Sequence, residues 1–466
     1  MLRKIFTMML LLSGSILIAQ TQLPSLFSDH MVLQQNTTVN LWGTDNPKEK
    51  ITVTTTWGAE ASAKTGKNGK WRLQLETTAA GGPYSITVSG SEEVMLKDVL
   101  LGEVWFASGQ SNMEMPVKGY RNQPITGSNE EILRSDNDQL RMFSAKRQVS
   151  MEPLNDIEGQ WNAASPATTG DFSATAYFFG KRLQEMLGVP VGLVHSSWGG
   201  STAEAWMDAA ALEPFPERTI PETMPERYEH HAPSLLFNGM LNPFIGYTMR
   251  GTIWYQGESN RKRATEYQEL FPAMIERWRE LWDQGSFPFY FAQIAPYGYE
   301  HVDSAGSAFL REAQLVALNN TENTGMAVTM DIGDCDCIHP ADKKTVGNRL
   351  AYWALANDYG MEGVAFRGPE YREMELLDNG RVKLHFDHTG EGLSFYENEP
   401  AGFEVAGNDQ VFYPAKAVIN RDKTLTVWCD KVPEPAAVRY AFKNCIDGVL
   451  YNVAGLPASS FRTDNW

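Results

Sequence analysis

The sequence contains few cysteines, which limits what can hold the fold together. Only four occur in 466 residues: Cys335, Cys337, Cys429 and Cys445. Four are too few for a disulfide scaffold of this size, so a hydrophobic core must supply most of the stability. Cys429 and Cys445 lie in neighbouring strand-like segments and could pair in an oxidising compartment. For Cys335 and Cys337 we favour buried packing over a metal or redox hook, because no second Cys/His cluster accompanies them.

Positive charge is also in short supply. Lysine and arginine together number 40 against 57 aspartates and glutamates, which gives a formal net charge of -17. Nucleic-acid binding requires clustered Lys and Arg to neutralise phosphates, so we expect no nucleic-acid partner. Internal repeats, low-complexity tracts and the Gly-x-Gly-x-x-Gly pattern are missing too, and the last absence excludes a dinucleotide-binding reading of the glycines.

Long hydrophobic runs are lacking outside the amino-terminal end. There a basic Met1-Leu2-Arg3-Lys4 precedes an apolar run from Met8 to Ala19, and polar residues follow at once. A basic head, a short apolar core and a small-residue exit describe a secretory signal peptide, which we place at residues 1–20. The run is too short to span a bilayer. We therefore expect an exported, periplasmic or secreted protein with no membrane span.

What the sequence does contain divides it into three parts. Residues 21–97 alternate apolar and polar positions between turn residues, as a small β-sandwich does. Residues 98–360 alternate apolar strand-like runs with amphipathic stretches, which indicates βαβ units and a parallel sheet. Alternation returns in residues 361–466, where Asn379-Gly380 predicts a hairpin turn. The predicted strands of the middle part are 99–107, 191–195, 249–255, 288–294 and 325–331, and its predicted helices are 173–187, 234–242, 264–283, 307–319 and 341–358.

The organising motif is Gly109-Gln110-Ser111-Asn112, which directly follows the first of these strands. Open α/β sheets bind ligands at the carboxyl ends of their strands. A glycine there permits a sharp turn that presents the next polar side chain at the tip of the strand. Ser111 is therefore our candidate nucleophile, although a single tetrapeptide of this kind is also what an ordinary Ser/Asn turn looks like.

A serine nucleophile needs a base, and His339 is the best placed of the eight histidines. It follows strand 325–331 and precedes Pro340 and a helix. Asp336 stands three residues earlier, where its carboxylate could accept from the imidazole and orient the ring. Asp334 is a rival carboxylate and Asp331 a weaker one.

Two further strand ends could supply donors to an oxyanion. Gly199-Gly200 follows strand 191–195 and opens a turn with free backbone N–H groups. Gln256-Gly257-Glu258-Ser259-Asn260 follows strand 249–255 and adds side-chain amides. Each cluster alone could be a plain loop or a surface amide, but four polar clusters on four strand ends of one domain favour a common site.

These blocks, in this order, resemble those of SGNH hydrolases, and specifically of bacterial sialate O-acetylesterases of the carbohydrate-esterase type. The likeness extends to the segments 23–35 and 455–464, so it covers nearly the whole chain after the predicted signal peptide. It implies a flavodoxin-like three-layer α/β/α domain flanked by two β-sandwich-like domains. It also implies removal of acetyl groups from sugar hydroxyls, with no metal and no cofactor.

Carried over by position, the resemblance makes Ser111 the nucleophile, His339 the base and Asp336 its orienter. The oxyanion hole would be built from Ser111, Gly199, Gly200 and Gln256. The third block departs from the commonest pattern, Gly-x-Asn-Asp, because Ser259 stands where asparagine is expected, and Gln256 is our preferred side-chain donor for that reason. The predicted substrate-binding residues are Gln110, Asn112, Glu258, Asn260, Trp198 and Arg250; Arg261 and Arg263 are further candidates for an anionic sugar.

Other functions remain open from the sequence. The acetylated sugar could be sialic acid, xylan or another glycan. A glycosidase could use two carboxylates such as Glu204 and Glu258, but Ser111 and His339 would then have no role. A non-catalytic glycan-binding protein, with two β-modules on an inert core, is the alternative from another class.

Overall fold

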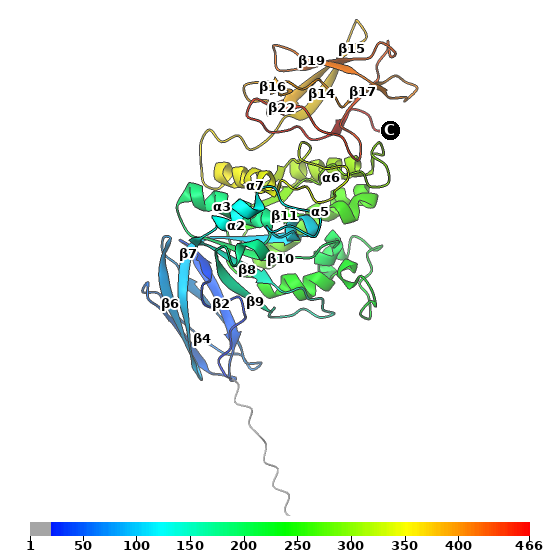
Figure 1. Ribbon diagram of the computed structural model, residues 1–466. Coiled ribbons are helices and arrows are strands. Elements are labelled where there is room, and N and C mark those ends of the chain that lie inside the picture. Colours follow the sequence, from blue (N-terminus) through cyan, green and yellow to red (C-terminus); the bar gives the residue numbers. More distant parts are fainter. Residues whose placement is uncertain (1–19) are drawn as a thin grey trace, which may run out of the picture.

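The computed structural model describes residues 20–466, so residues 1–19 of the predicted signal peptide lie outside the described part. Three regions follow one another in space as they do in sequence (Figure 1). The N-terminal strands lie at the lower left, the helices and the central sheet in the middle, and the C-terminal strands at the top. Within residues 20–466, no helix is both long and apolar enough to cross a membrane.

The N-terminal region is built of strands, as the alternating pattern predicts. In β5, buried and exposed residues alternate strictly along the strand, which is the pattern of a strand with one face on a core. β2 pairs with β5, and β3 pairs with both β4 and β6, all antiparallel. The strands are β1 (Val32–Gln34), β2 (Thr38–Thr44), β3 (Lys50–Thr55), β4 (Glu60–Lys64), β5 (Lys70–Glu76) and β6 (Gly81–Ser89).

One long strand, β7 (Glu93–Gly109), joins this region to the central sheet. Its first half pairs with β6 and β1, and its second half with β10 (Val191–Ser197) and β11 (Gly251–Tyr255). A single hydrophobic core runs through both regions. The boundary that we predict after residue 97 therefore falls inside a continuous strand.

The central sheet is parallel except at one edge. Its order is β13-β12-β11-β7-β10-β8-β9, in which only β9 runs antiparallel to its neighbour. All five predicted strands are present; β8 and β9 were not predicted. The remaining bounds are β8 (Asn137–Ala145), β9 (Gly159–Ala164), β12 (Phe289–Ala292) and β13 (Thr324–Ala327).

This order places the end of β7 at a topological switch point. β7 lies between its two parallel neighbours, β10 and β11. The chain therefore continues first on one side of β7 and later on the other. Such a point opens a crevice outside the carboxyl ends of the strands, where α/β proteins bind their ligands. Ser111 lies two residues beyond the end of β7.

Helices cover both faces of the sheet. The adjacent β7 residues Trp105 and Phe106 point to opposite faces. Trp105 packs edge-on against Phe179 of α3, whereas Phe106 packs against Trp278 of α5. α3 packs against α7 and α5 against α6, which completes three layers (Figure 1). The helices are α1 (Ser111–Glu114), α2 (Ser128–Leu133), α3 (Ala174–Leu187), α4 (Ala209–Leu212), α5 (Ala264–Trp282), α6 (Gly306–Asn320) and α7 (Lys343–Asn357).

Four of the five predicted helices agree closely with α3, α5, α6 and α7. The fifth, 234–242, is not a regular α-helix but a π-type turn, η4 (Phe237–Leu241), followed by a 3₁₀ turn, η5 (Asn242–Phe244). Gly239 lies against another segment here, because a Cβ at this position would be 2.3 Å from the backbone oxygen of Gln148. The segment is shaped by close packing against residues 148–149 rather than by its own periodicity.

The C-terminal region is a second set of strands with a hydrophobic core of its own. β14 and β15 form the antiparallel hairpin that Asn379-Gly380 predicts. The strands are β14 (Glu370–Leu377), β15 (Arg381–Asp387), β16 (Leu393–Ser394), β17 (Phe403–Ala406), β18 (Tyr413–Pro414), β19 (Lys416–Ile419), β20 (Leu425–Trp428), β21 (Ala437–Tyr440), β22 (Tyr451–Asn452) and β23 (Phe461–Arg462).

A disulfide joins this region to the central domain, but it is not the pair considered from the sequence. Cys335 bonds Cys445, while Cys337 and Cys429 are free. The packing role that we favoured for Cys335 is therefore wrong as well. Both errors have one cause, because 110 residues separate the bonded pair and sequence proximity gives no sign of it.

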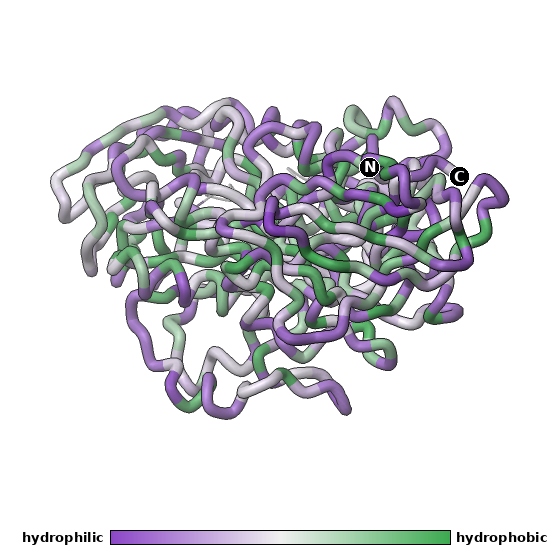
Figure 2. The backbone as a smooth tube through the Cα atoms, turned by 90° about the horizontal axis from the view of Figure 1, so that it is seen from above, coloured by the Kyte–Doolittle hydropathy of each residue, from purple (hydrophilic) through white to green (hydrophobic). Residues whose placement is uncertain are grey.

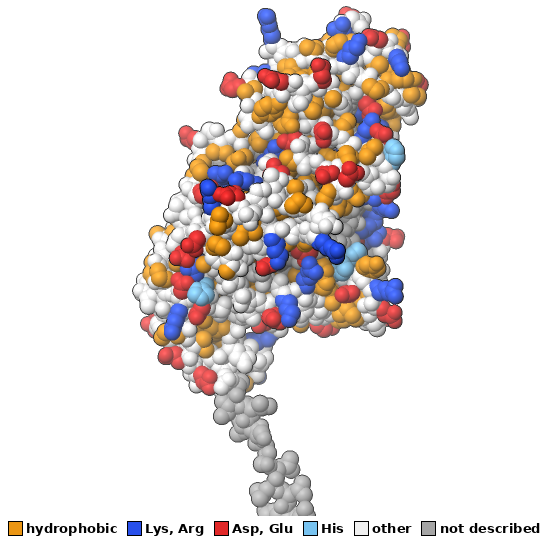
Figure 3. All heavy atoms as spheres, viewed as in Figure 1, with side chains coloured by type: hydrophobic (Ala, Val, Ile, Leu, Met, Phe, Trp, Pro, Cys, Tyr) orange, Lys and Arg blue, Asp and Glu red, His pale blue; other side chains and the backbone are white. Residues whose placement is uncertain are grey.

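Polar and apolar residues are mixed both along the backbone and on the surface (Figure 2 and Figure 3). Hydrophobic and hydrophilic segments alternate along much of the backbone (Figure 2). On the face shown in Figure 3, acidic and basic side chains are interspersed.

Candidate active site

The turn that carries Ser111 depends on a glycine. Gly109 has a φ of 142°, and a Cβ there would lie 2.2 Å from the backbone oxygen of Tyr255 on the adjacent β11. Only glycine permits both the positive φ and this close approach. The backbone N–H of Gln110 then donates to that same oxygen at 2.9 Å, which fixes the start of the turn against β11.

Ser111 is the first residue of the one-turn helix α1 and is half-buried. Two hydrogen bonds fix this helical turn: the Ser173 hydroxyl donates to the Met113 carbonyl at 2.5 Å, and the Thr175 hydroxyl donates to the Asn112 carbonyl at 3.0 Å. Within residues 20–466, neither the N–H nor the hydroxyl of Ser111 makes a hydrogen bond. Both groups are therefore free to meet a substrate.

His339 has the protonation state that a general base requires. Its Nδ1 lies 2.6 Å from Oε1 of Gln123, an acceptor, so Nδ1 carries the proton and Nε2 keeps its lone pair. Burial, together with the nearby Lys343 ammonium, lowers the pKa of His339 from 6.5 to about 4. The imidazole is therefore neutral at pH 7 and can accept a proton through Nε2.

Asp336 does not have the contact expected of it. Its side chain is exposed, and its only hydrogen bond among the described residues is made by its backbone N–H, which donates to Asp334. Gln123 occupies the position at Nδ1 that we assigned to Asp336. Asp331, the other carboxylate considered for this role, forms a bidentate ion pair with Arg349, so it is not available to His339 either.

The Gly199-Gly200 turn packs directly against Ser111. A Cβ on Gly199 would lie 3.3 Å from the Ser111 Cβ. The Gly199 N–H donates to Oε2 of Glu114 at 2.9 Å, whereas the Gly200 N–H makes no hydrogen bond within residues 20–466. The structure thus brings both glycines to the site but leaves only one of their N–H groups open.

The third block also lies at the site, but Gln256 is not free to act as a donor. The amide is completely buried; its Nε2 donates to the Ser201 carbonyl at 3.2 Å and to Asn260 Oδ1 at 2.7 Å. Both amide hydrogens thus have protein acceptors in this structure, and Gln256 has none to offer an oxyanion unless one of these bonds breaks. Asn260 is similarly committed, because its amide donates to Glu204 at 2.8 Å.

The predicted substrate-binding residues fall into three groups. Asn112, Glu258, Gln110 and Asn260 are buried and bonded to protein groups rather than open to a ligand. Trp198 is half-buried next to Gly199, and its indole packs against His230 and Arg147. Arg250 lies at the amino end of β11, where it donates to the Asp358 carbonyl, so it is at the opposite edge of the sheet from Ser111.

Trp198 is part of a ring-and-cation cluster next to the site. His230, from the 3₁₀ turn η3 (Glu229–His231), stacks on Trp198 with 5.0 Å between the centroids and 2° between the planes. Arg147 lies over the same indole at 5.7 Å and pairs with Glu114. We call Trp198, His230 and Arg147 the Trp198 cluster. It lies in the loops that follow the strands and so borders the Ser111 edge.

The serine turn and the histidine loop are tied to each other. The Asn112 amide, one residue after Ser111, donates to the carbonyl of Ile338, one residue before His339, at 3.1 Å. The structure thus brings together the Ser111, Gly199-Gly200, 256–260 and His339 segments.

Sequence reasoning missed Gln123, Glu114, Arg147 and Lys343. Gln123 lies in a turn that pairs back on Tyr120, and nothing in its sequence context points to His339. Glu114 is within the serine motif and could have been noticed for that reason. Arg147 and Lys343 lie in segments that approach Ser111 only through the fold.

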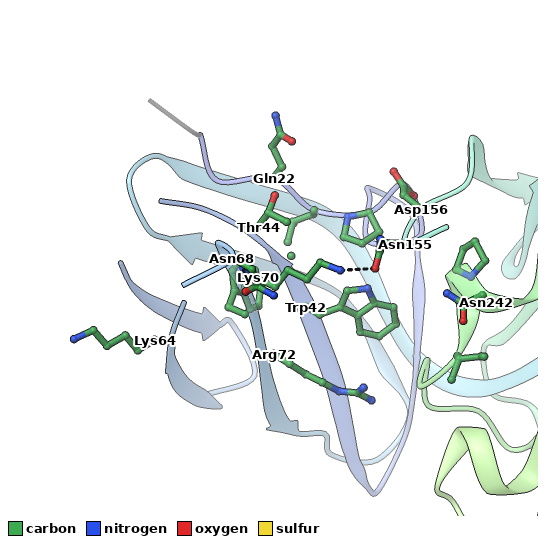
Figure 4. Close-up of a pocket in the computed structure, with 16 residues that line it drawn as sticks. Gln22, Trp42, Thr44, Lys64, Asn68, Lys70, Arg72, Asn155, Asp156 and Asn242 are labelled. Atoms are coloured by element: carbon green, nitrogen blue, oxygen red, sulfur yellow. Dashed lines mark hydrogen bonds between the residues drawn. The ribbon is translucent and has the colours of Figure 1, made fainter. Parts of the chain in front are cut away.

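A cleft elsewhere does not coincide with this site. A cavity of about 680 Å³ lies between the N-terminal strands and the segments 155–156 and 242–245 (Figure 4). It is lined by Trp42 and the basic side chains Lys64, Lys70 and Arg72, and Lys70 donates to Asn155 at 2.7 Å. Neither Ser111 nor His339 lines it. In the described part of the chain, no cluster of three His, Cys, Asp or Glu side chains is arranged to hold a metal ion.

Comparison with known proteins identifies the class. A solved carbohydrate acetylesterase from Xanthomonas citri superposes with a TM-score of 0.88 at 37% identity, covering 96% of this chain and 100% of that one. Sialate O-acetylesterase from Mus musculus is 30% identical over 512 residues, or 94% of this chain and 93% of that protein. The human sialate O-acetylesterase is 33% identical over 392 residues, or 76% and 74%. The chain is therefore a carboxylic ester hydrolase of the carbohydrate-esterase class.

The family follows from a second match. The model described as "Carbohydrate esterase, sialic acid-specific acetylesterase" matches residues 101–356. This chain belongs to that family, and the resemblance drawn from the motifs is confirmed.

Proposed function

We propose that this enzyme removes O-acetyl groups from sialic acid, with Ser111 as the nucleophile and His339 as the general base. The observation that carries the proposal is the junction of the two segments at the switch point, where Asn112 holds the loop of His339 beside Ser111. The names of the family and of the mammalian relatives supply the acetylated sialic acid.

The reaction would proceed in two halves. His339 Nε2 accepts the proton of the Ser111 hydroxyl as Oγ attacks the acetyl carbonyl carbon. The protonated His339 then donates that proton to the sugar oxygen as the C–O bond breaks and the alcohol leaves. In the second half His339 takes a proton from water as the hydroxide attacks the acetyl-serine; the bond to Ser111 Oγ then breaks, His339 returns the proton to Oγ, and acetic acid leaves and ionises to acetate in solvent.

The negative charge of each tetrahedral intermediate would be stabilised by backbone donors. The N–H groups of Ser111 and Gly200 are unpaired within residues 20–466 and lie in adjoining turns. Gly199 joins them only if its N–H leaves Glu114. In other acyl-transfer enzymes, removing one oxyanion-hole donor lowers kcat by about 10²–10³-fold.

In this proposal Gln123 orients the imidazole ring of His339. A neutral amide oxygen fixes the Nδ1–H tautomer as a carboxylate does, although it stabilises the imidazolium less, because it carries no charge. The contact at 2.6 Å supports Gln123 over Asp336.

The wider assignments are part of the same proposal. Strands β10, β7, β11, β12 and β13 have the order 2-1-3-4-5 when counted along the chain, which supports a flavodoxin-like SGNH domain, with β8 and β9 added beyond β10. The proposal also includes a signal peptide, two β-rich domains that flank an esterase domain, and export of the protein.

A second substrate class is favoured by one observation. The structure that matches 96% of the chain is described only as a carbohydrate acetylesterase. Acetylated xylo-oligosaccharides or other neutral glycans therefore remain the alternative to sialic acid.

Acetate release separates these functions. The wild-type enzyme, Ser111→Ala and His339→Ala are each incubated with O-acetylated sialic acid and with acetylated xylo-oligosaccharide. We expect release by wild type, faster from the sialic acid, and loss of release in both variants. Full acetate release by Ser111→Ala would contradict the serine mechanism. Release by wild type from the xylo-oligosaccharide alone would show that the substrate is a neutral glycan and not sialic acid.

A further inference from the structure

Three buried polar residues lie directly behind the candidate site. Lys343, the first residue of α7, and Asn112 are 0% exposed, and Glu258 is 9% exposed. Lys343 Nζ donates to Asn112 Oδ1 at 2.6 Å, and Asn112 Nδ2 donates to Glu258 Oε1 at 2.6 Å. The neutral amide thus links a buried cation to a buried carboxyl group. We call these three residues the buried relay.

The buried relay binds the carbonyl groups of the two residues that flank His339 in sequence. Asn112 Nδ2 donates to the carbonyl of Ile338 at 3.1 Å, and Lys343 Nζ donates to the carbonyl of Pro340 at 2.9 Å. Because Asn112 is covalently next to Ser111, the relay fixes the backbone around His339 directly to the backbone of the serine. The amide of Asn112 can be oriented in only one way, since the other would place its NH₂ against the ammonium.

We propose that Lys343, Asn112 and Glu258 are positioning residues that hold His339 in register with the Ser111 hydroxyl. The inference rests on the proposed function, because it assumes that these two residues react together. It also reassigns Asn112 and Glu258, which sequence reasoning placed among the substrate-binding residues. Their burial leaves little surface for a ligand.

A role in stability alone explains the buried relay poorly. A buried ammonium and a buried carboxyl group are costly to desolvate, and well-packed apolar residues are often equally stable in their place. The cost is visible here: burial lowers the pKa of Lys343 to about 7 and raises the pKa of Glu258. One oxygen of Glu258 is also buried without a hydrogen-bond partner within residues 20–466. The bonds to Ile338 and Pro340 supply the reason to retain such groups.

The test replaces the relay while preserving the fold. Lys343→Met removes the donor to Pro340, and Lys343→Met/Glu258→Gln also removes the carboxyl group left behind. Lys344→Met is the matched control, because Lys344 is the next residue of α7 but pairs with Glu131 at the surface. Each protein is assayed for acetate release from O-acetylated sialic acid, with its thermal midpoint measured in parallel.

We expect both Lys343 variants to lose about 10- to 100-fold in kcat, since displacing a reacting group by about 1 Å costs on that order. KM should change by less than about threefold, because the relay does not touch the sugar. Lys344→Met should match wild type. Glu258→Gln should retain most of the rate, because its amide oxygen can still accept from Asn112, and this conservative variant shows that geometry rather than charge matters.

The outcomes separate the inference from the proposed function. If the folded double variant has the kcat of Lys344→Met while Ser111→Ala is inactive, the positioning role is wrong and the serine mechanism stands. If Ser111→Ala is fully active, the proposed function fails first. Should the Lys343 variants not fold, Asn112→Asp gives the same test, since it keeps the acceptor for Lys343 but loses both donated bonds; an unchanged kcat there would overturn the inference.

Discussion

His339 donates from Nδ1 to Oε1 of Gln123 over 2.6 Å, and Gln123 comes from a turn 216 residues earlier in the chain. This relationship predicts which residue orients the base. We expect Gln123→Ala to lower kcat by about tenfold or more, because the ring loses its tautomer and its fixed plane. Asp336→Ala should have a small effect, because its side chain is exposed. Steady-state kinetics of the two variants side by side decide the matter, and the reverse ranking would return the orienting role to Asp336.

The pKa of His339 predicts an unusual acid limb. Burial first, and the Lys343 charge second, lower this pKa from 6.5 to about 4. The neutral form is the base, and a lowered pKa keeps it populated to more acidic pH. The value of kcat/KM should therefore stay level as the pH falls through 6.5 and decline only near pH 4. The profile is measured by acetate release, and a half-maximal point near 6.5 would show that His339 is either solvated or not the base.

The Trp198 cluster predicts a selective effect on sugar binding. Trp198→Ala should raise KM for an acetylated glycan by about tenfold, because the reaction at Ser111 is unchanged while His230 and Arg147 lose the indole that they pack against beside the site. The kinetics with p-nitrophenyl acetate, which has no sugar to stack, should stay within about twofold. Equal losses on both substrates would mean that Trp198 supports the Gly199-Gly200 turn instead.

Arg147 offers a test of the charge of the substrate. It is the cation of the Trp198 cluster, and half of its side chain is exposed. Arg147→Met should weaken catalysis on acetylated sialic acid more than on acetylated xylo-oligosaccharide, because only the former carries a carboxylate. Since Arg147 also pairs with Glu114, the ratio of the two kcat/KM values is the informative quantity. An unchanged ratio would favour a neutral glycan.

The disulfide between Cys335 and Cys445 predicts a contribution to the free energy of unfolding. Cys335–Cys445 ties the loop that precedes His339 to the C-terminal region across 110 residues. Its removal in Cys335→Ala/Cys445→Ala should lower the free energy of unfolding by about 2–5 kcal/mol. Cys429→Ser is the control, because that thiol is free. Urea denaturation of the three proteins measures the difference, and equal midpoints would show that the bond contributes nothing.

Much of the fold could be predicted because its signals are local. Periodicity located α3, α5, α6 and α7 and the five central strands, and Asn379-Gly380 located a hairpin, since each depends on residues close in sequence. The motif of Ser111 and the segment of His339 were found for the same reason. Strand ends carry recognisable turns, and parallel strands bring their carboxyl ends to one edge.

The contacts between those segments could not be predicted in the same way. Gln123 reaches His339, Cys445 reaches Cys335, and Lys343 reaches Asn112 across 110 to 231 residues of chain. No local pattern encodes such pairs. For Gln256 the sequence shows an amide at a strand end, but not that Ser201 and Asn260 accept both of its hydrogens. For Arg250 the sequence shows a positive charge, but not that it bonds Asp358 at the amino end of β11, away from Ser111.

If Ser111 is the nucleophile, it carries the acetyl group during turnover. This is measured by rapid acid quenching of the enzyme with an excess of O-acetylated sialic acid or p-nitrophenyl acetate, followed by peptide mapping by mass spectrometry. We expect an acetyl group on the peptide that contains Ser111, at the serine itself, and none in Ser111→Ala. An acetyl group on another residue, or full turnover by Ser111→Ala, would contradict it.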